Sequence, residues 1–223
     1  MTYIFHDDAG NKSLKIKADL FKYLVKVRRH VNGDKIDFRS RQKLSQLYTY
    51  EVVSVEPRSI ELNLVSSSIK EVKSKKSLHI GWCLIDSKSI EKVLPSLCEV
   101  GVKKISFIYC DRSQKNFKVD FNRFERILEA SMQQSGRSDY IEFNTYKDIK
   151  EFIIEFPDTK VFDFCDKILE DTVELKTVLI GCEGGFSSNE RMVLSEQDTF
   201  RLDTAMILRS ESAVIAVASK LLL

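Results

Sequence analysis

The segment Val178-Leu-Ile-Gly-Cys-Glu-Gly-Gly-Phe-Ser187, near the C-terminal end of the sequence, decides the fold. Its apolar first residues predict a buried strand that ends at the first glycine. The pair Gly184-Gly185 predicts a tight turn, because glycine adopts positive φ without a steric cost. Ser187 or Ser188 is then placed to cap a helix. A glycine turn between a strand and a helix leaves backbone N–H groups free at the carboxyl end of the strand, where open α/β sheets bind ligands.

A second segment, Leu202-Asp-Thr-Ala-Met-Ile-Leu-Arg-Ser-Glu-Ser212, repeats this arrangement. A loop leads into a C-terminal helix, which Ser210-Glu211-Ser212 is predicted to open as a serine and acid helix start. Composition alone fits equally well with two ordinary helix starts. The first segment lacks the spaced glycines of a dinucleotide fingerprint and the Gly-Lys-Ser/Thr of a P-loop, so neither site is predicted.

The composition is that of an ordinary globular protein, with 43% hydrophobic and 30% charged residues among the 223. The net charge is only +2, so a nucleic-acid surface must come from local clustering of cations. No run approaches the roughly 18 consecutive apolar residues of a membrane span. The first residues, Met1-Thr-Tyr-Ile-Phe, do not resemble a signal peptide. We therefore expect a cytoplasmic protein that makes no use of a membrane.

The cysteines and histidines are scattered. There is no C-x-x-C pair, so we expect reduced and mostly buried thiols. The histidines are far apart in the sequence, so no metal site is expected. These residues are Cys83, Cys98, Cys110, Cys165 and Cys182, and His6, His30 and His79.

The chain is predicted to hold two domains. Residues 1–70 contain short strands around one helix, which suggests a small β-barrel. Serines and lysines dominate residues 66–77, and we assign 71–77 as a linker. Residues 78–223 alternate strands and helices, which predicts an α/β domain with a parallel sheet covered by helices. The expected strands are Tyr3–Phe5, Lys35–Phe38, Leu47–Val53, Ile60–Val65, Leu78–Ile85, Lys104–Tyr109, Tyr140–Phe143, Lys160–Phe164, Thr177–Ile180 and Phe200–Leu202. The expected helices are Ala18–Arg28, Lys88–Val100, Phe121–Gln134, Lys147–Glu155, Asn189–Glu196 and Ser210–Leu222.

Three helices carry further signals. Pro95 is expected to kink its helix or shorten its start, and Gly101 is expected to end it. The last helix is apolar almost all round, so it is buried either within its own domain or, as we prefer, against a second subunit. The helix over Ala18–Arg28 has a basic face. Alone such a face is best explained as a solvated surface, but together with the lysines of the linker it makes a plausible phosphate-contacting surface.

Six segments, in order along nearly the whole chain, resemble the RsmE family of the SPOUT superfamily, which methylates N3 of a uridine in 16S ribosomal RNA. Any one of them is a weak signal, and the six in order are fairly specific. They are Tyr23-Leu-Val-Lys-Val-Arg-Arg with Gly33-Asp-Lys-Ile, Glu99-Val-Gly-Val, Asp111-Arg-Ser-Gln, Gln133-Gln-Ser-Gly-Arg, Ile180-Gly-Cys-Glu-Gly-Gly-Phe-Ser and Leu208-Arg-Ser-Glu-Ser-Ala.

The resemblance implies a PUA-like N-terminal barrel that docks RNA and a C-terminal SPOUT-type α/β domain with a deep trefoil knot. It also implies S-adenosyl-L-methionine as cofactor, 16S ribosomal RNA or the 30S subunit as partner, no metal, and a homodimer through the C-terminal helix. The chain departs from the family pattern at Cys182, where proline is usual, at Asp203-Thr-Ala, where Gly-Pro-Arg is usual, and at Pro95, where a lysine is usual.

The same resemblance suggests the site residues. A guanidinium near O2 or O4 of uridine favours the anion formed when N3 loses its proton, and Arg209 or Arg137 is the candidate. Glu211 accepts that proton or orients the arginine, or is simply a capping acid. The expected cofactor-binding residues are Phe164, Cys165, Asp166, Ile180, Gly181, Cys182, Glu183, Gly184, Gly185, Leu202, Asp203, Ala205, Ile207, Leu208, Arg209 and Ser210. The expected RNA-binding residues are Lys22, Lys26, Arg28, Arg29 and Arg112.

Three functions compete at this point. We favour a uridine-N3 methyltransferase. A second possibility keeps the fold and changes the RNA target, for example to a ribose 2′-hydroxyl. The third is a non-catalytic RNA-binding protein, which the departures at Cys182 and at Asp203-Thr-Ala motivate.

Overall fold

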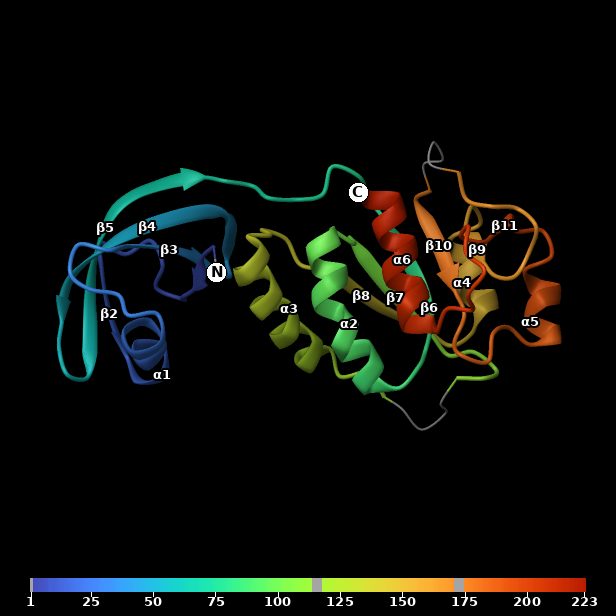
Figure 1. The fold of residues 1–223 in the computed structure, drawn as a ribbon, viewed down its shortest axis with the longest axis horizontal. Coiled ribbons are helices and arrows are strands. Elements are labelled where there is room, and N and C mark those ends of the chain that lie inside the picture. The colour runs from blue at the N-terminus through green and yellow to red at the C-terminus, as the bar shows by residue number, and fades with distance from the viewer. Residues whose placement is uncertain (1, 114–117, 171–174) are drawn as a thin grey trace. The chain divides into compact units, whose positions relative to one another are not determined.

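The computed structural model describes residues 2–113, 118–170 and 175–223, and these fall into two compact units (Figure 1). The first unit runs to Lys73 and also includes Met132–Asp139, and the second holds Ser74–Ser131 and Tyr140–Leu223. The change of unit after Lys73 falls within the expected linker 71–77. Gln114, the last residue of the segment that begins at Asp111, lies outside the described residues.

The first unit is built on a curled sheet of five strands in the order β1-β3-β4-β5-β2. β1 runs parallel to β3, and the other neighbours are antiparallel. The sequence prediction missed β2, whose alternation of buried and exposed residues is only five residues long. β5 continues to Ile69, so the start of the polar stretch 66–77 is strand and not linker. The strands are β1 (Ile4–Phe5), β2 (Ser13–Lys17), β3 (Lys35–Ser40), β4 (Lys43–Val55) and β5 (Ser59–Ile69).

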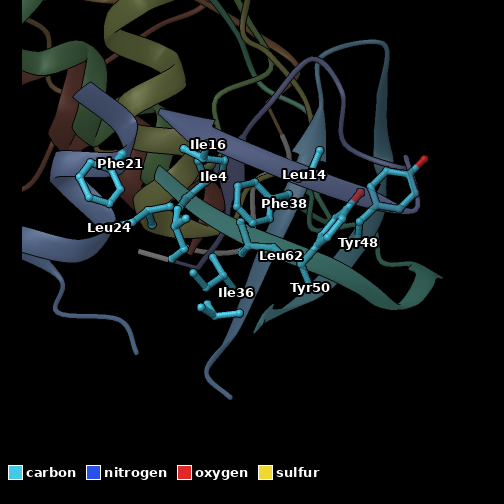
Figure 2. Close-up of a cluster of buried hydrophobic side chains, with 12 residues drawn as sticks. Ile4, Leu14, Ile16, Phe21, Leu24, Ile36, Phe38, Tyr48, Tyr50 and Leu62 are labelled. Atoms are coloured by element: carbon cyan, nitrogen blue, oxygen red, sulfur yellow. The ribbon is translucent and has the colours of Figure 1, made fainter. Parts of the chain in front are cut away.

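A hydrophobic core packs against this sheet (Figure 2). Phe38 and Tyr50 meet edge to face at its centre, with ring centroids 5.5 Å apart. The predicted helix over Ala18–Arg28 is present as a short α-helix, α1 (Ala18–Phe21), followed by a π-helix, η1 (Lys22–Val27). Phe21 and Leu24 from these two elements join the same core.

The second unit contains a six-stranded sheet in the order β11-β9-β10-β6-β7-β8, and every neighbouring pair in it is parallel. The predicted α/β class with a parallel sheet is therefore confirmed. Its strands are β6 (His79–Cys83), β7 (Lys104–Ile108), β8 (Glu142–Tyr146), β9 (Lys160–Phe162), β10 (Thr177–Ile180) and β11 (Thr199–Phe200). The helices that follow them are α2 (Ser87–Val100), α3 (Phe121–Ser135), α4 (Ile149–Glu155), α5 (Ser188–Val193) and α6 (Ser210–Leu222).

Two neighbouring residues of β6 show how helices cover both faces of this sheet (Figure 1). The indole Nε1 of Trp82 donates to Ser210 Oγ in α6 at 2.8 Å. A Cβ on the preceding residue, Gly81, would lie 2.5 Å from the ring of Phe152 in α4. Since successive strand residues face opposite sides, α6 and α4 cover opposite faces, and only glycine fits at position 81.

The ends of α2 test two sequence expectations. Gly101 ends the helix with φ 98° in the left-handed region, as predicted. The expectation that Pro95 shortens the start is wrong, because α2 begins at Ser87, where the side chain of Asp86 accepts from the Ser89 N–H. Proline at this position removes one N–H from the helical ladder and crowds the carbonyl four residues earlier, yet the helix continues past it to Val100. The expected kink stays a prediction.

Helix α6 is buried to a large extent by its own unit, where it packs against α2 and β10 (Figure 1). Its apolar character therefore has a local explanation, and burial by a second subunit stays a prediction. The buried residues of α6 are Ser210, Ala213, Val214, Val217, Ala218, Leu221 and Leu222.

The expectation of unpaired thiols is wrong for two of the five cysteines. Cys83 and Cys110 form a disulfide, with Cα atoms 5.8 Å apart, which lies within the usual range for such a bond. Cys83 ends β6 and Cys110 follows the neighbouring strand β7, so the sheet brings them together. Cys98 and Cys182 keep their thiols and are buried as expected, whereas Cys165 keeps its thiol but is only partly buried.

Within the described residues, no helix combines the length and the apolarity needed to cross a membrane. The same residues contain no cluster of three or more His, Cys, Asp or Glu side chains arranged to hold a metal ion.

The unfolding free energy is expected to fall by about 2 kcal/mol between pH 7 and pH 5 on account of His79. Burial, with a smaller contribution from Lys104, lowers the pKa of His79 to about 4. The unfolded state takes up a proton near pH 6.5, whereas the folded state resists protonation until about pH 4, so acid favours unfolding across this window. Denaturant titrations at the two pH values measure the loss.

The matched variant for this test is His79→Gln, since glutamine can still bond Ser106 Oγ, which lies 2.8 Å from His79 Nε2. The variant should lose less stability than the wild type between pH 7 and pH 5. An equal loss in both proteins would show that other groups cause the acid sensitivity.

Candidate active site

A cavity of about 280 Å³ opens at the carboxyl ends of β9, β10 and β11. Ligands of parallel α/β sheets bind at this edge. Of the residues expected to bind the cofactor, the following line the cavity: Phe164, Ile180, Gly181, Cys182, Glu183, Gly185, Leu202, Ile207, Leu208, Arg209 and Ser210.

The glycine turn after β10 forms one wall of the cavity. Gly185 has φ +64°, and its N–H donates to the Cys182 carbonyl at 2.9 Å, which closes a tight turn. A Cβ on Gly181 would lie 3.5 Å from the Cα of Gly185. Burial raises the pKa of the Cys182 thiol, so this side chain stays neutral in the wall. The segments Val178–Ser187 and Leu202–Ser212, which the sequence analysis identified, therefore line the same cavity.

Ser210 joins the glycine turn to the last helix. Its hydroxyl donates to the Gly181 carbonyl at 2.6 Å and accepts from Trp82 Nε1 at 2.8 Å. The helix α6 begins at Ser210 with Glu211 in its first turn, as predicted, but the N-cap residue is Arg209, and no described side chain makes a capping hydrogen bond there. The Ser210 hydroxyl, which was expected to cap α6, instead connects the start of α6 to the glycine turn.

The carboxylate of Glu190 ties a third loop to the glycine turn. Ser187 caps α5 as predicted, in a capping box with Glu190. One oxygen of Glu190 accepts from the Ser187 N–H and the other from the Asp111 N–H, both at 2.8 Å. The guanidinium of Arg112, the next residue, donates to the Gly184 carbonyl. This buried carboxylate thus holds Arg112 over the turn.

Exchange of Glu190 for alanine is expected to lower the unfolding free energy by about 1–3 kcal/mol, because two partly buried N–H groups lose their acceptor. Glu190→Gln keeps one amide oxygen as acceptor and should lose roughly half as much. Denaturant titration of the two variants measures the difference. Equal losses in both variants would contradict the assignment of one N–H to each oxygen.

Arg209 and Glu211 flank the first residue of α6. Arg209 Nη1 lies 4.0 Å from Glu211 Oε1, with the arginine side chain 82% exposed and the glutamate side chain 19% exposed. Glu211 Oε2 is buried and has no hydrogen-bond partner among the described residues. A buried carboxylate oxygen without a partner costs free energy, so a function that needs this atom explains its presence better than stability does.

The other expected cofactor residues, Cys165, Asp166, Gly184, Asp203 and Ala205, do not line the cavity. These five residues lie close in sequence to lining residues but are not part of the cavity wall. Sequence reasoning did not assign seven further lining residues to the cofactor, although Phe162, Asp163 and Arg201 lie near the carboxyl ends of predicted strands. Thr204 and Met206 lie in the second segment, Leu202–Ser212. The missed residues are Phe162, Asp163, Phe186, Arg201, Thr204, Met206 and Ala213.

Arg137, the alternative catalytic arginine, belongs to the first unit and is 5% exposed. Its Nε donates to Asp139 Oδ1 at 3.1 Å, and its carbonyl accepts from the Tyr3 hydroxyl at 2.8 Å. These contacts favour a packing role over a catalytic one.

The expected RNA-binding residues lie in both units. Arg112 is exposed beside the glycine turn of the second unit. The other four are exposed on η1 and the turn after it, in the first unit: Lys22, Lys26, Arg28 and Arg29.

Comparison with known proteins gives a consistent result. The RNA methyltransferase domain family matches residues 72–222. The ribosomal RNA small subunit methyltransferase E of Helicobacter pylori is 37% identical to this chain over 223 residues, and the match covers 98% of each protein.

Solved structures share the fold along nearly the whole chain. A probable rRNA-methyltransferase from Porphyromonas gingivalis superposes with a TM-score of 0.80 at 19% identity, covering 100% of this chain and 98% of the other. The ribosomal RNA small subunit methyltransferase E of Neisseria gonorrhoeae, bound to S-adenosyl methionine, superposes with a TM-score of 0.76 at 16% identity, covering 98% and 95%. With a family match over most of its length and a full-length relative at 37% identity, the chain belongs to the RsmE family of RNA methyltransferases.

Proposed function

We propose that this protein transfers a methyl group from S-adenosyl-L-methionine to N3 of a uridine in 16S ribosomal RNA. The observation that carries the proposal is the cavity at the carboxyl ends of three parallel strands, with a glycine turn on one side and Arg209 on another. Family membership supports the reaction class, and the Helicobacter relative is named for methylation of small-subunit ribosomal RNA.

The residues around the cavity fit S-adenosyl-L-methionine. Ile180, Leu202 and Leu208 offer apolar surface for an adenine ring. Gly181 and Gly185 place backbone against the cavity without a side chain, which allows close approach to a ribose or an amino-acid group. The Neisseria relative of the same fold binds this cofactor. When bound, the cofactor supplies an electrophilic methyl group.

The chain's own task is to position the uridine and to manage its charge. The N3–H of uridine loses its proton only well above neutral pH, so N3 is a poor nucleophile at neutral pH. We assign Glu211 as the acceptor of that proton, because its Oε2 is buried and has no partner among the described residues. We assign Arg209 to the negative charge that develops on O2 or O4, since its guanidinium is exposed at the cavity.

The detailed assignments of the two units, the dimer and the location rest on the resemblance to the RsmE family. We propose that the first unit is a PUA-like barrel that docks RNA, with 71–77 as the linker, and that the second unit carries the trefoil knot. Homodimerisation through α6 is part of the same proposal, and so is a cytoplasmic location. The curled five-stranded sheet supports the barrel.

The test uses purified protein, S-adenosyl-L-methionine and 30S particles from a strain that lacks the gene. Primer extension should reveal a new block, and mass spectrometry of the digested RNA should show 3-methyluridine. A ribose-methylated nucleoside in its place would favour the 2′-hydroxyl target. Calorimetry that detects no cofactor binding would favour a non-catalytic RNA-binding protein and would end the proposal.

A further inference from the structure

A second cavity, of about 420 Å³, lies entirely within the first unit and shares no residue with the candidate active site. It opens beside η1, and strands β3 and β4 line its other side. Its wall combines the aromatic ring of Tyr23 with two cations, Arg28 and Lys35, and it also holds the imidazole of His30. No residue that the candidate methyl-transfer chemistry uses lines it.

The polar groups of this cavity suit a nucleotide. Arg28 and Lys35 are both exposed, so their charged groups are accessible to a phosphate. Tyr23 is partly buried against the core, which holds its ring in place. The carboxylate of Asp37 accepts from Thr49 Oγ1 at 2.6 Å, and this pair adds an acceptor and a hydroxyl to the wall. An aromatic ring beside two cations is typical of sites for single-stranded nucleic acid.

The backbone at the cavity departs from regular geometry. The π-helix η1 runs over Lys22–Val27 and carries Tyr23. Arg29, directly after Arg28, has φ +61°, a left-handed conformation that costs free energy in a residue with a side chain. π-Helical turns and strained residues occur frequently at functional sites. Here both features adjoin residues of the cavity wall, since Tyr23 lies in the π-helix and Arg28 directly precedes Arg29.

Cations continue beyond the cavity along the same segment. Lys22, Lys26 and Arg29 are exposed on η1 and the turn that follows it. A single small anion needs only the cavity, whereas a polynucleotide can contact the cavity and this row together. A base can enter such a cavity only when it is unpaired.

From these observations we propose that the cavity binds one unpaired nucleotide of the RNA, with its base against Tyr23 and its phosphate on Arg28 and Lys35. The proposal rests on the proposed function in that RNA is the substrate. It adds a recognition site in the first unit, separate from the candidate active site.

Fluorescence anisotropy with a short labelled single-stranded RNA and with a duplex RNA tests the site. Arg28→Glu and Lys35→Glu should each weaken binding of the single strand by about tenfold, and Arg28→Ala should reduce the slope of log affinity against log salt by about 1. Tyr23→Leu should weaken it by about tenfold through lost stacking, whereas Tyr23→Phe should bind as the wild type does. The matched control is Lys12→Glu, an exposed charge reversal in the first unit and outside the cavity wall.

Three results would overturn the site: affinities of Arg28→Glu and Lys35→Glu equal to that of Lys12→Glu, equal affinity of Tyr23→Leu and Tyr23→Phe, or the same losses on duplex RNA. Circular dichroism of each variant controls for folding. Cofactor binding, measured by calorimetry, should stay unchanged in the variants. If the wild type neither binds the cofactor nor methylates RNA, the proposed function fails, while the anisotropy result still decides the fate of this site.

Discussion

Exchange of Glu211 for glutamine lowers kcat for methyl transfer by about 100-fold or more, because the amide cannot take the N3 proton. Affinity for S-adenosyl-L-methionine should change by less than about threefold, since Glu211 does not line the cavity. The unfolding free energy should stay equal or rise, because the substitution replaces a carboxylate, whose buried Oε2 has no partner among the described residues, by an amide that costs less to bury. Single-turnover methylation of 30S particles, calorimetry and denaturant titration measure these quantities.

The control for this variant is Glu183→Gln, the same chemical change at an exposed carboxylate that lines the cavity. It should leave kcat within about threefold of the wild type. A capping role for Glu211 makes the opposite prediction, with a loss of stability and an unchanged kcat. That outcome, or equal effects of both substitutions on kcat, would remove Glu211 from the chemistry.

The sequence predicted the edge of the sheet where the cavity lies, because the signals there are local. An apolar run followed by a glycine turn specifies both a strand end and a close backbone approach. Ser187 or Ser188 was predicted to cap the following helix, and the structure assigns the cap to Ser187. Most of the expected residues at 180–185 and 207–210 therefore line the cavity.

Features that depend on distant contacts were not predictable in this way. The Cys83–Cys110 disulfide depends on which strands are neighbours, and their separation in sequence does not specify this. Ser210 resembles a cap in sequence, yet its hydroxyl bonds the Gly181 carbonyl, which only the folded sheet brings close. Arg137 became a candidate because it lies in the segment Gln133-Gln-Ser-Gly-Arg. In the structure its side chain is buried and paired with Asp139, and the sequence pattern does not reveal that burial.

The substitution Gly185→Val, in the glycine turn, is expected to weaken binding of the cofactor by about tenfold. Valine at φ +64° costs about 1–2 kcal/mol. The variant avoids this cost by leaving the left-handed conformation, and cofactor binding must then restore it. A cost of about 1.4 kcal/mol corresponds to a tenfold change in dissociation constant, which calorimetry measures directly.

Gly33→Val provides the matched control, because Gly33 also has a positive φ, +90°, and a Cβ at either glycine meets no atom within 4 Å. The two valine variants should therefore lose similar unfolding free energy, while only Gly185→Val loses cofactor affinity. Gly185→Asn should bind the cofactor more tightly than Gly185→Val, since asparagine tolerates the left-handed region better. If Gly33→Val weakened binding as much as Gly185→Val, the effect would come from global destabilisation and the turn would not be the cofactor's cradle.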